Sequence, residues 1–119
     1  MLSYFVAMCA CAQPEFMAPE ALQGQEYTAS VDWWSLGCLC CEMLTGSTPW
    51  FEQDQKLVDM LIKILNKPIV VPSHEHVGPA EVEFIGALLT RDPVKRLGSG
   101  PHGHMGVLGH PWFHEQAMV

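Results

Sequence analysis

The sequence predicts a mainly α-helical protein, and three stretches support this fold class. The first is the run 31–44, which carries no charge between Asp32 and Glu42. The second, residues 54–66, places apolar side chains at helical spacing on one face and charged ones opposite. The third begins at Pro79 and combines a helix-starting proline with an acidic first turn and spaced apolar residues.

The run 31–44 is predicted to be the central helix. A helix that is apolar all round belongs in the interior, where other elements cover it. Ser30 or Asp32 can cap its start, and Gly46 stands where a C′ glycine is expected. At about 1.5 Å per residue the helix would span roughly 20 Å, which is too short for a bilayer. A buried strand is the alternative, but strands usually stop at about eight residues.

Shorter elements flank the central helix. Residues 1–12 are apolar and uncharged and are expected to pack on the domain; a secretory signal is the alternative, but it lacks a basic n-region. Pro19 is placed to open a short helix at its first position. A turn over 92–96 and a glycine-rich loop lead to the C-terminal segment 107–113. The inward side chains of the helix from Pro79 are expected to be Val82, Ile85, Leu88 and Leu89.

The net charge and the cysteine content limit the kinds of binding partner and cell compartment that we expect. The net charge of −7 disfavours nucleic acid and anionic membranes and favours basic ligands. Five cysteines, three of them in the central helix, are typical of a reducing compartment, where cysteine acts as a small hydrophobe. We therefore expect an intracellular protein, in the cytoplasm, with the nucleus as an alternative. Composition leaves the oligomeric state open.

Two patterns imitate ligand sites. Residues 98–103 fit G-x-G-x-x-G, but a phosphate site needs a strand before the glycines and a helix N-terminus after them. Here a turn precedes them and Pro101 removes one N–H donor, so a surface loop is expected. His114 begins an H-E-x-x-H pattern that fails at Met118, and the other histidines lack zinc-site spacing. No metal site is predicted.

Glu42 is the one charge in the second half of the central helix. A buried carboxylate needs a partner or an opening to water. The residues alone support two interpretations equally, a functional carboxylate and a point where the helix simply reaches the surface.

Several motifs in this sequence resemble those of the C-terminal lobe of serine/threonine protein kinases. They occur in the same order as in that family. Residues 14–20 (PEFMAPE) resemble the P+1 loop that ends in A-P-E, and 32–37 (DWWSLG) resemble the start of helix F. Residues 45–51 fit the loop to helix G, while 92–98 (DPVKRLG) and 110–113 (HPWF) fit the end of the domain. The doubled tryptophan and the R-L-G-x-G…H-P-W-F ending resemble the AGC group, nearest to ribosomal S6 kinase-like or Akt-like enzymes.

The resemblance implies that residues 14–113 form a partial kinase C-lobe. The family's ATP-binding glycine loop, strand lysine, helix C glutamate, H-R-D-x-x-x-x-N and D-F-G lie upstream of A-P-E, and none occurs in this sequence. The N-lobe and catalytic loop are therefore expected to be absent from this chain. Residues 1–13 are expected to be an apolar segment of doubtful origin, and 114–119 a tail. A fragment, an alternative transcript or an incomplete gene product would explain this pattern.

The resemblance assigns no catalytic, cofactor-binding or metal-binding residue to this chain. The residues that it places at the substrate are Pro14, Glu15, Phe16, Met17 and Glu42. Glu42 matches the helix F glutamate that receives a substrate arginine, which favours the functional interpretation of this carboxylate. The resemblance also implies structural residues. Glu20 and Arg96 would form an ion pair that clamps the A-P-E segment, with Trp34 packed against it. Asp32 would brace the backbone of the H-R-D motif.

The resemblance also implies the chemistry of the parent enzyme. Such a kinase transfers phosphate from ATP, with Mg²⁺, to serine or threonine near basic residues of a protein substrate. The chain itself is predicted to be inactive and to hold neither cofactor. The alternatives are a non-catalytic binding or decoy fragment and an incomplete gene product.

Overall fold

The computed structural model describes residues 14–117, and side chains as far as His114. All regular structure in this part of the chain is helical, which confirms the predicted mainly α fold. No helix within it is both long and apolar enough to cross a membrane. The N-terminal segment 1–13 lies outside the described residues. The elements in order are η1 (Pro14–Phe16), α2 (Pro19–Leu22), α3 (Ser30–Thr45), α4 (Leu57–Asn66), α5 (Pro79–Leu88), α6 (His104–Leu108) and α7 (Pro111–Ala117).

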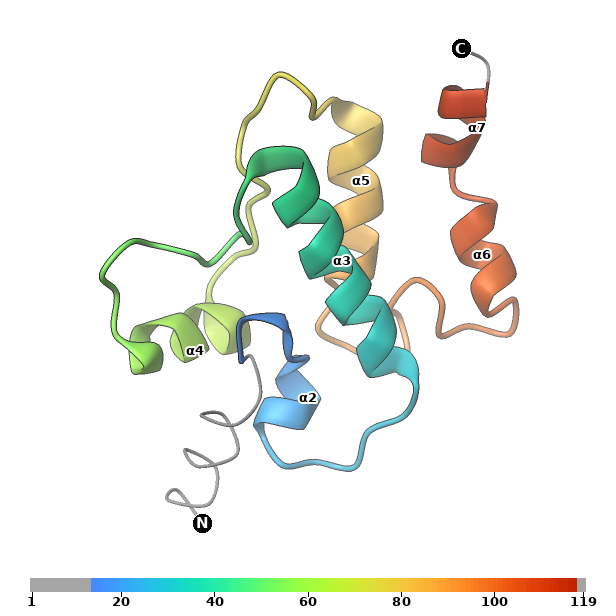
Figure 1. Cartoon of the computed structure of the whole chain (residues 1–119). Coiled ribbons are helices and arrows are strands. Elements are labelled where there is room, and N and C mark those ends of the chain that lie inside the picture. The colour runs from blue at the N-terminus through green and yellow to red at the C-terminus, as the bar shows by residue number, and fades with distance from the viewer. Residues whose placement is uncertain (1–13, 118–119) are drawn as a thin grey trace.

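Helix α3 is the central element, as predicted. It runs through the middle of the molecule with α5 alongside it, while α2 and α4 lie on one side and α6 and α7 on the other (Figure 1). Trp34, Cys38 and Cys41 are fully buried at 0% exposure. The helices approach closely because Gly37 has no side chain: a Cβ there would lie 2.9 Å from Leu88 Cβ.

One side of α3 is open, since Leu39 is 45% and Met43 68% exposed. One expectation about this helix, the cap at its start, was wrong. Neither Ser30 nor Asp32 caps the start; the helix follows Ala29, and Thr28 Oγ1 accepts the Ser30 N–H at 3.2 Å.

The predicted end of α3 is confirmed. Gly46 has φ of 91°, in the left-handed region, and its N–H donates to Glu42 O at 2.7 Å. Only glycine adopts this conformation without a steric cost, so the helix terminates here and the chain turns towards α4.

Helices α4 and α5 depart from the expected patterns at single positions. Helix α4 begins at Leu57 rather than near Asp54, which has a positive φ of 61°. Ile85 and Leu88 of α5, and Leu89 directly after it, face the core as predicted. Val82 does not: it is 44% exposed, and Phe84 is buried on the inward side in its place.

The C-terminal elements close the domain through aromatic contacts. Phe84 of α5 stacks on Trp112 with ring centroids 4.8 Å apart and meets Phe113 edge-on at 5.4 Å. The ring of His110 lies 5.1 Å from Phe84. Helix α7 continues to Ala117, across the boundary at residue 113 where the sequence places a tail.

Candidate functional site

A hollow of about 620 Å³ lies between η1, α3 and α4. Figure 1 shows η1, in blue, beside α3 and α4. The lining side chains are Pro14, Glu15, Phe16, Leu39, Glu42, Leu57 and Met60. Four of the five residues predicted to meet substrate therefore gather in one place, although 28 positions separate Pro14 from Glu42. The fifth, Met17, packs against the hydrophobic core instead, and its contact with substrate stays a prediction.

Three hydrogen bonds from α3 and the loop after it hold η1 over this hollow. Ser35 Oγ donates to Phe16 O at 2.8 Å, and Trp50 Nε1 donates to Glu15 O at 2.8 Å. Thr48 Oγ1 donates to Glu15 Oε1 at 2.6 Å. Sequence reasoning missed Ser35, Thr48 and Trp50 as determinants of the site. Single hydrogen bonds across 19–35 positions leave no periodic signal in a sequence.

Leu39, Leu57 and Met60 were also missed as lining residues. Their apolar spacing predicts helices but does not tell which side chains face a neighbouring helix and which face an opening. In the structure Leu39 is 45% and Leu57 38% exposed, and together with Met60 they give the hollow an apolar wall.

Glu42 is an exposed carboxylate at the edge of the hollow. Among the side chains that the structure describes, none forms an ion pair or hydrogen bond with this carboxylate. Glu42 lies in the last turn of α3, where the helix dipole adds partial negative charge. An anion at this position therefore gains from a cationic ligand, which the described side chains do not supply.

The ion pair predicted to clamp the A-P-E segment is formed by side chains 76 positions apart. Arg96 Nη1 donates to Glu20 Oε1 at 2.6 Å, and Nη2 donates to Glu20 Oε2 at 3.0 Å. Both residues are buried, at 1% and 4% exposure. The guanidinium also donates to backbone carbonyls, including Thr90 O at 2.8 Å and Ser30 O at 3.0 Å. A buried pair with both ends hydrogen-bonded is the arrangement that offsets desolvation of the charges.

Stacked aromatic rings connect this pair to the hollow. The guanidinium carbon of Arg96 lies 5.2 Å from the ring centroid of Trp34. Trp34 in turn stacks on Trp50 at 5.6 Å with an interplanar angle of 9°. Because Trp50 donates to Glu15 O, the chain of contacts runs from the buried ion pair to η1.

Comparisons with known proteins agree with this arrangement. The family model described as "Protein kinase domain" matches residues 5–113. The chain belongs to the protein kinase domain family. It is 44% identical over 103 residues to serine/threonine protein kinase ypkA of Aspergillus fumigatus and 45% identical over 103 residues to protein kinase C-like 2 of Schizosaccharomyces pombe. The cAMP-dependent protein kinase catalytic subunit of Arthrobotrys oligospora is 40% identical over 105 residues.

These relatives confirm the predicted resemblance to AGC-type serine/threonine kinases. The alignments cover 87%, 87% and 88% of this chain. The chain spans 16%, 10% and 20% of the length of those three relatives.

Asp32 lies on the exposed side of α3. Asp32 is exposed near the start of α3, and the structure gives its carboxylate no partner among the described side chains. It lies seven positions before Leu39, so the two share the exposed side of the helix. The predicted contact with the H-R-D backbone stays a prediction.

The described residues do not fit Mg-ATP, which kinases of this family use. No group of three or more histidine, cysteine or acidic side chains in residues 14–114 is arranged to hold a metal ion. The glycine loop 98–103 leads into α6, which has five residues, and no strand precedes it. Gly98 packs against a side chain instead: a Cβ there would lie 2.5 Å from the Trp33 ring.

The cysteines of α3 are structural in this chain. Burial raises the pKa of the Cys38 thiol, and the nearby Cys41 adds to the effect. Burial likewise raises the pKa of Cys40 and Cys41. A thiol whose pKa is raised stays protonated at neutral pH and is a poor nucleophile or metal ligand.

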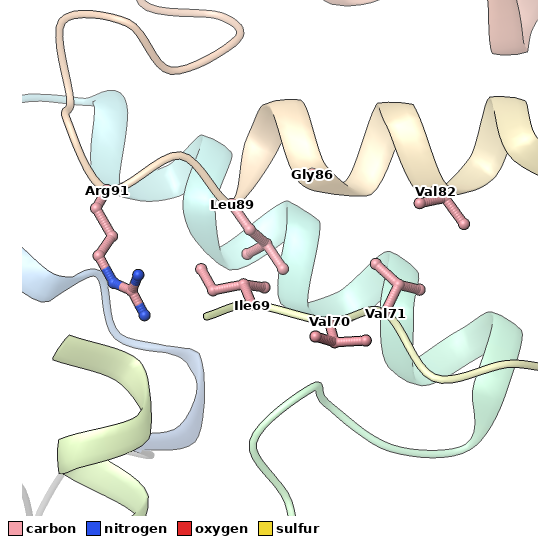
Figure 2. A pocket seen from close by; sticks show the side chains of 7 residues that line it. All are labelled: Ile69, Val70, Val71, Val82, Gly86, Leu89 and Arg91. Atoms are coloured by element: carbon pink, nitrogen blue, oxygen red, sulfur yellow. The ribbon is translucent and has the colours of Figure 1, made fainter. Parts of the chain in front are cut away.

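A second hollow, of about 470 Å³, lies between the segment 69–71 and α5. Figure 2 shows Leu89 and Val82 of the α5 region facing the side chains of this segment. Its one charged residue, Arg91, points towards α4, where it donates to Ile64 O at 2.8 Å. The guanidinium therefore caps the C-terminus of α4. The side chains that line this hollow are apolar apart from Arg91, whose Nε and Nη2 are engaged with α4 and the residue after it, so the hollow at Glu42 is the stronger candidate.

Proposed function

We propose that this chain carries the peptide-recognition part of a serine/threonine protein kinase that modifies serine or threonine near basic residues. The observation that supports this most directly is the Glu42 carboxylate, which has no partner among the described side chains and lies beside an apolar wall. The stem of an arginine or lysine can pack on Leu39 or Met60 while its charged head reaches Glu42. The net charge of −7 favours the approach of a basic peptide.

The chain by itself is proposed to transfer no phosphate. Kinase chemistry depends on positioning and on electrostatic stabilisation of the transferred group by a lysine, metal ions and the catalytic loop. The motifs that supply these groups do not occur in the sequence. ATP and Mg²⁺ belong to the chemistry of the parent family, and the substrate of the whole enzyme is a protein with basic residues near the acceptor.

A non-catalytic binding or decoy role is the second candidate. It is favoured by the combination of the hollow at Glu42 with the absence of these catalytic motifs from the sequence. The two candidates differ in one measurement, the labelling of a basic peptide by radioactive Mg-ATP. Binding without labelling supports the decoy role for this chain, whereas labelling above buffer contradicts it.

The experiment that tests recognition is a titration of the chain with a fluorescent peptide, with and without an arginine. We expect the arginine to tighten binding roughly fivefold, the upper range for a solvent-exposed ion pair. Glu42→Gln should abolish this difference, whereas Glu26→Gln, at an exposed carboxylate away from the hollow, should preserve it. An arginine preference that survives Glu42→Gln would contradict the proposal.

An intracellular location is also proposed. The three buried thiols of α3 are free rather than paired in disulfides, which suits a reducing compartment. Fractionation of cells that express the tagged protein tests this directly.

A further inference from the structure

Ser99 stands in a sequence context that no other hydroxyl residue of this chain shares. Lys95 and Arg96 precede it by four and three positions. No other serine or threonine in the sequence follows a lysine or arginine within four positions. Protein kinases select their acceptors partly by the pattern of charge around them. The segment 95–99 therefore has the composition of an acceptor for a kinase that requires basic residues before the serine.

The folded chain hides most of this pattern. Arg96 is 1% exposed, and its three guanidinium nitrogens all donate to groups of the protein, so an enzyme cannot contact this side chain. Gly98 is fixed as well, because at a φ of +96° it packs directly against the Trp33 ring. Ser99 is half-buried, and its hydroxyl donates to Ser30 Oγ at 2.7 Å. A kinase can therefore bind this segment only after the segment has separated from the domain.

The Ser99 hydroxyl is connected to the buried ion pair of Glu20 and Arg96 through one residue. Ser30 Oγ accepts from Ser99 and also from Arg96 Nη1, the latter at 3.1 Å. Ser99 lines a hollow of about 250 Å³ together with Glu20 and Glu26. A phosphate on Ser99 would bring about −1.5 to −2 elementary charges to the side of the hollow that holds these two carboxylates.

A phosphate on Ser99 would compete with Glu20 for the guanidinium. Like a carboxylate, a phosphate can accept two parallel, charge-assisted hydrogen bonds from arginine, and it carries more charge. Ser99 is three positions from Arg96 in the chain, whereas Glu20 is 76 positions away. Because the phosphate also repels the returning Glu20 carboxylate, the ion pair would stay open.

We propose that Ser99 is a phosphorylation site, that a kinase selective for preceding basic residues reaches it only when the pair of Glu20 and Arg96 is open, and that the phosphate then prevents the pair from closing. In this reaction Ser99 Oγ attacks the γ-phosphorus of ATP held by that kinase. The bond between the γ-phosphorus and the bridging oxygen breaks, ADP leaves, and the hydroxyl proton passes to the catalytic aspartate of the kinase. The inference is independent of the proposed function, because this chain is the substrate here and the hollow at Ser99 shares no lining residue with the hollow at Glu42.

The first experiment tests whether the segment is an acceptor. The synthetic peptide 92–101 and the full chain are incubated with radioactive Mg-ATP and the catalytic subunit of cAMP-dependent protein kinase. The peptide should be labelled, and alanine in place of Lys95 and Arg96 should remove most of the label. The folded chain should be labelled more slowly than the peptide, and Ser99→Ala should abolish its labelling. Equal labelling of the two peptides, or label that persists in Ser99→Ala, would overturn the assignment of the site.

The second experiment tests whether the ion pair controls access. Glu20→Gln weakens the pair without altering the acceptor segment. Modification of a transiently open segment follows the population of the open form, so this variant should be labelled at least roughly tenfold faster than the wild type. Glu26→Gln removes a carboxylate from the same hollow but keeps the pair, and should match the wild type.

A milder variant covers the case in which Glu20→Gln does not fold. Ser30→Ala removes the hydroxyl that lies between Ser99 and Arg96, and should raise the labelling rate by a smaller factor. Thermal unfolding identifies which of the two variants is folded. A folded variant that is labelled at the wild-type rate would show that the ion pair does not control access to Ser99.

Hydrogen exchange of the fully phosphorylated chain tests the last step. If the phosphate holds the pair open, the amides of residues 18–25, which include α2, should exchange at least roughly tenfold faster than in the unmodified chain. The amides of α4, which lies outside this contact, should exchange at the same rate in both forms. Unchanged exchange over residues 18–25 would mean that the pair closes despite the phosphate, which contradicts the proposal.

Discussion

Replacing Arg96 by alanine should destabilise the domain more than any surface change. The substitution removes the cation from a Glu20 carboxylate that is 4% exposed. It also removes donors from the carbonyls of Ser30 and Thr90, which accept from the guanidinium at 3.0 and 2.8 Å. The carboxylate cannot move into water without displacing α2, in which all four residues are buried.

The magnitude follows from what the substitution leaves behind. A buried ion pair broken from one side costs about 3–5 kcal/mol, because the remaining charge is desolvated and unpaired. Domains of this size are typically stable by only about 5–15 kcal/mol, so such a loss is a large share of the total. The exposed pair between Lys63 and Glu52, at 2.7 Å, offers a contrast within the same chain. Its side chains are 32% and 69% exposed, so Lys63→Ala should cost about 0–1 kcal/mol.

Urea unfolding followed by tryptophan fluorescence measures these differences. Arg96→Lys keeps the charge but loses the two-pronged contact with Glu20, and should fall between the wild type and Arg96→Ala. Lys95→Ala, at the exposed neighbouring position, is the matched control and should be nearly neutral. An unfolding free energy for Arg96→Ala within about 1 kcal/mol of the wild type would refute the assignment of a structural clamp.

Three further predictions concern close contacts and the buried thiols. Gly98→Ala should destabilise the domain by at least about 2 kcal/mol, because the new Cβ would lie 2.5 Å from the Trp33 ring and the residue has a φ of +96°. Gly100→Ala is the control and should be tolerated, because no atom lies within 4 Å of a Cβ at that position. Gly37→Ala should cost about 1–3 kcal/mol by forcing α3 and α5 apart, since its Cβ would lie 2.9 Å from side chains of α5, and equal urea midpoints would contradict this. Burial raises the pKa of Cys38, so the folded state holds this proton more tightly than the unfolded state. The contribution of this thiol to the free energy of unfolding should therefore be complete below the unfolded thiol pKa of roughly 8.5 and should decline as the pH rises above it. Urea unfolding midpoints at neutral and alkaline pH measure this decline.

The sequence was sufficient for the elements whose signal is local and repeated. The uncharged run identified α3, and Gly46 marked its end, because one left-handed residue is enough to terminate a helix. The start of α3 was misjudged because Ser30 is engaged elsewhere: its carbonyl and hydroxyl both accept from Arg96. A residue with good capping chemistry does not cap when tertiary contacts use its side chain.

The site itself was predictable only in part. The resemblance to kinases placed Glu20 next to Arg96 and brought Glu42 near Pro14, and no periodic pattern could have joined residues so far apart. The support beneath these residues was not predicted. Thr48 lies in a segment whose composition indicates only a turn, and its hydroxyl becomes important because the fold buries it against Glu15.

The buried ion pair and the hollow at Glu42 are parts of one packed unit. Trp34 lies between the Arg96 guanidinium and the ring of Trp50, and both rings are buried. Trp50 carries the donor that fixes Glu15 at the edge of the hollow. Aromatic rings in a close-packed core cannot shift independently, so a displacement at the ion pair reaches η1 through two ring contacts and one hydrogen bond. The ion pair is therefore connected, through Trp34 and Trp50, to the position of η1 at the hollow.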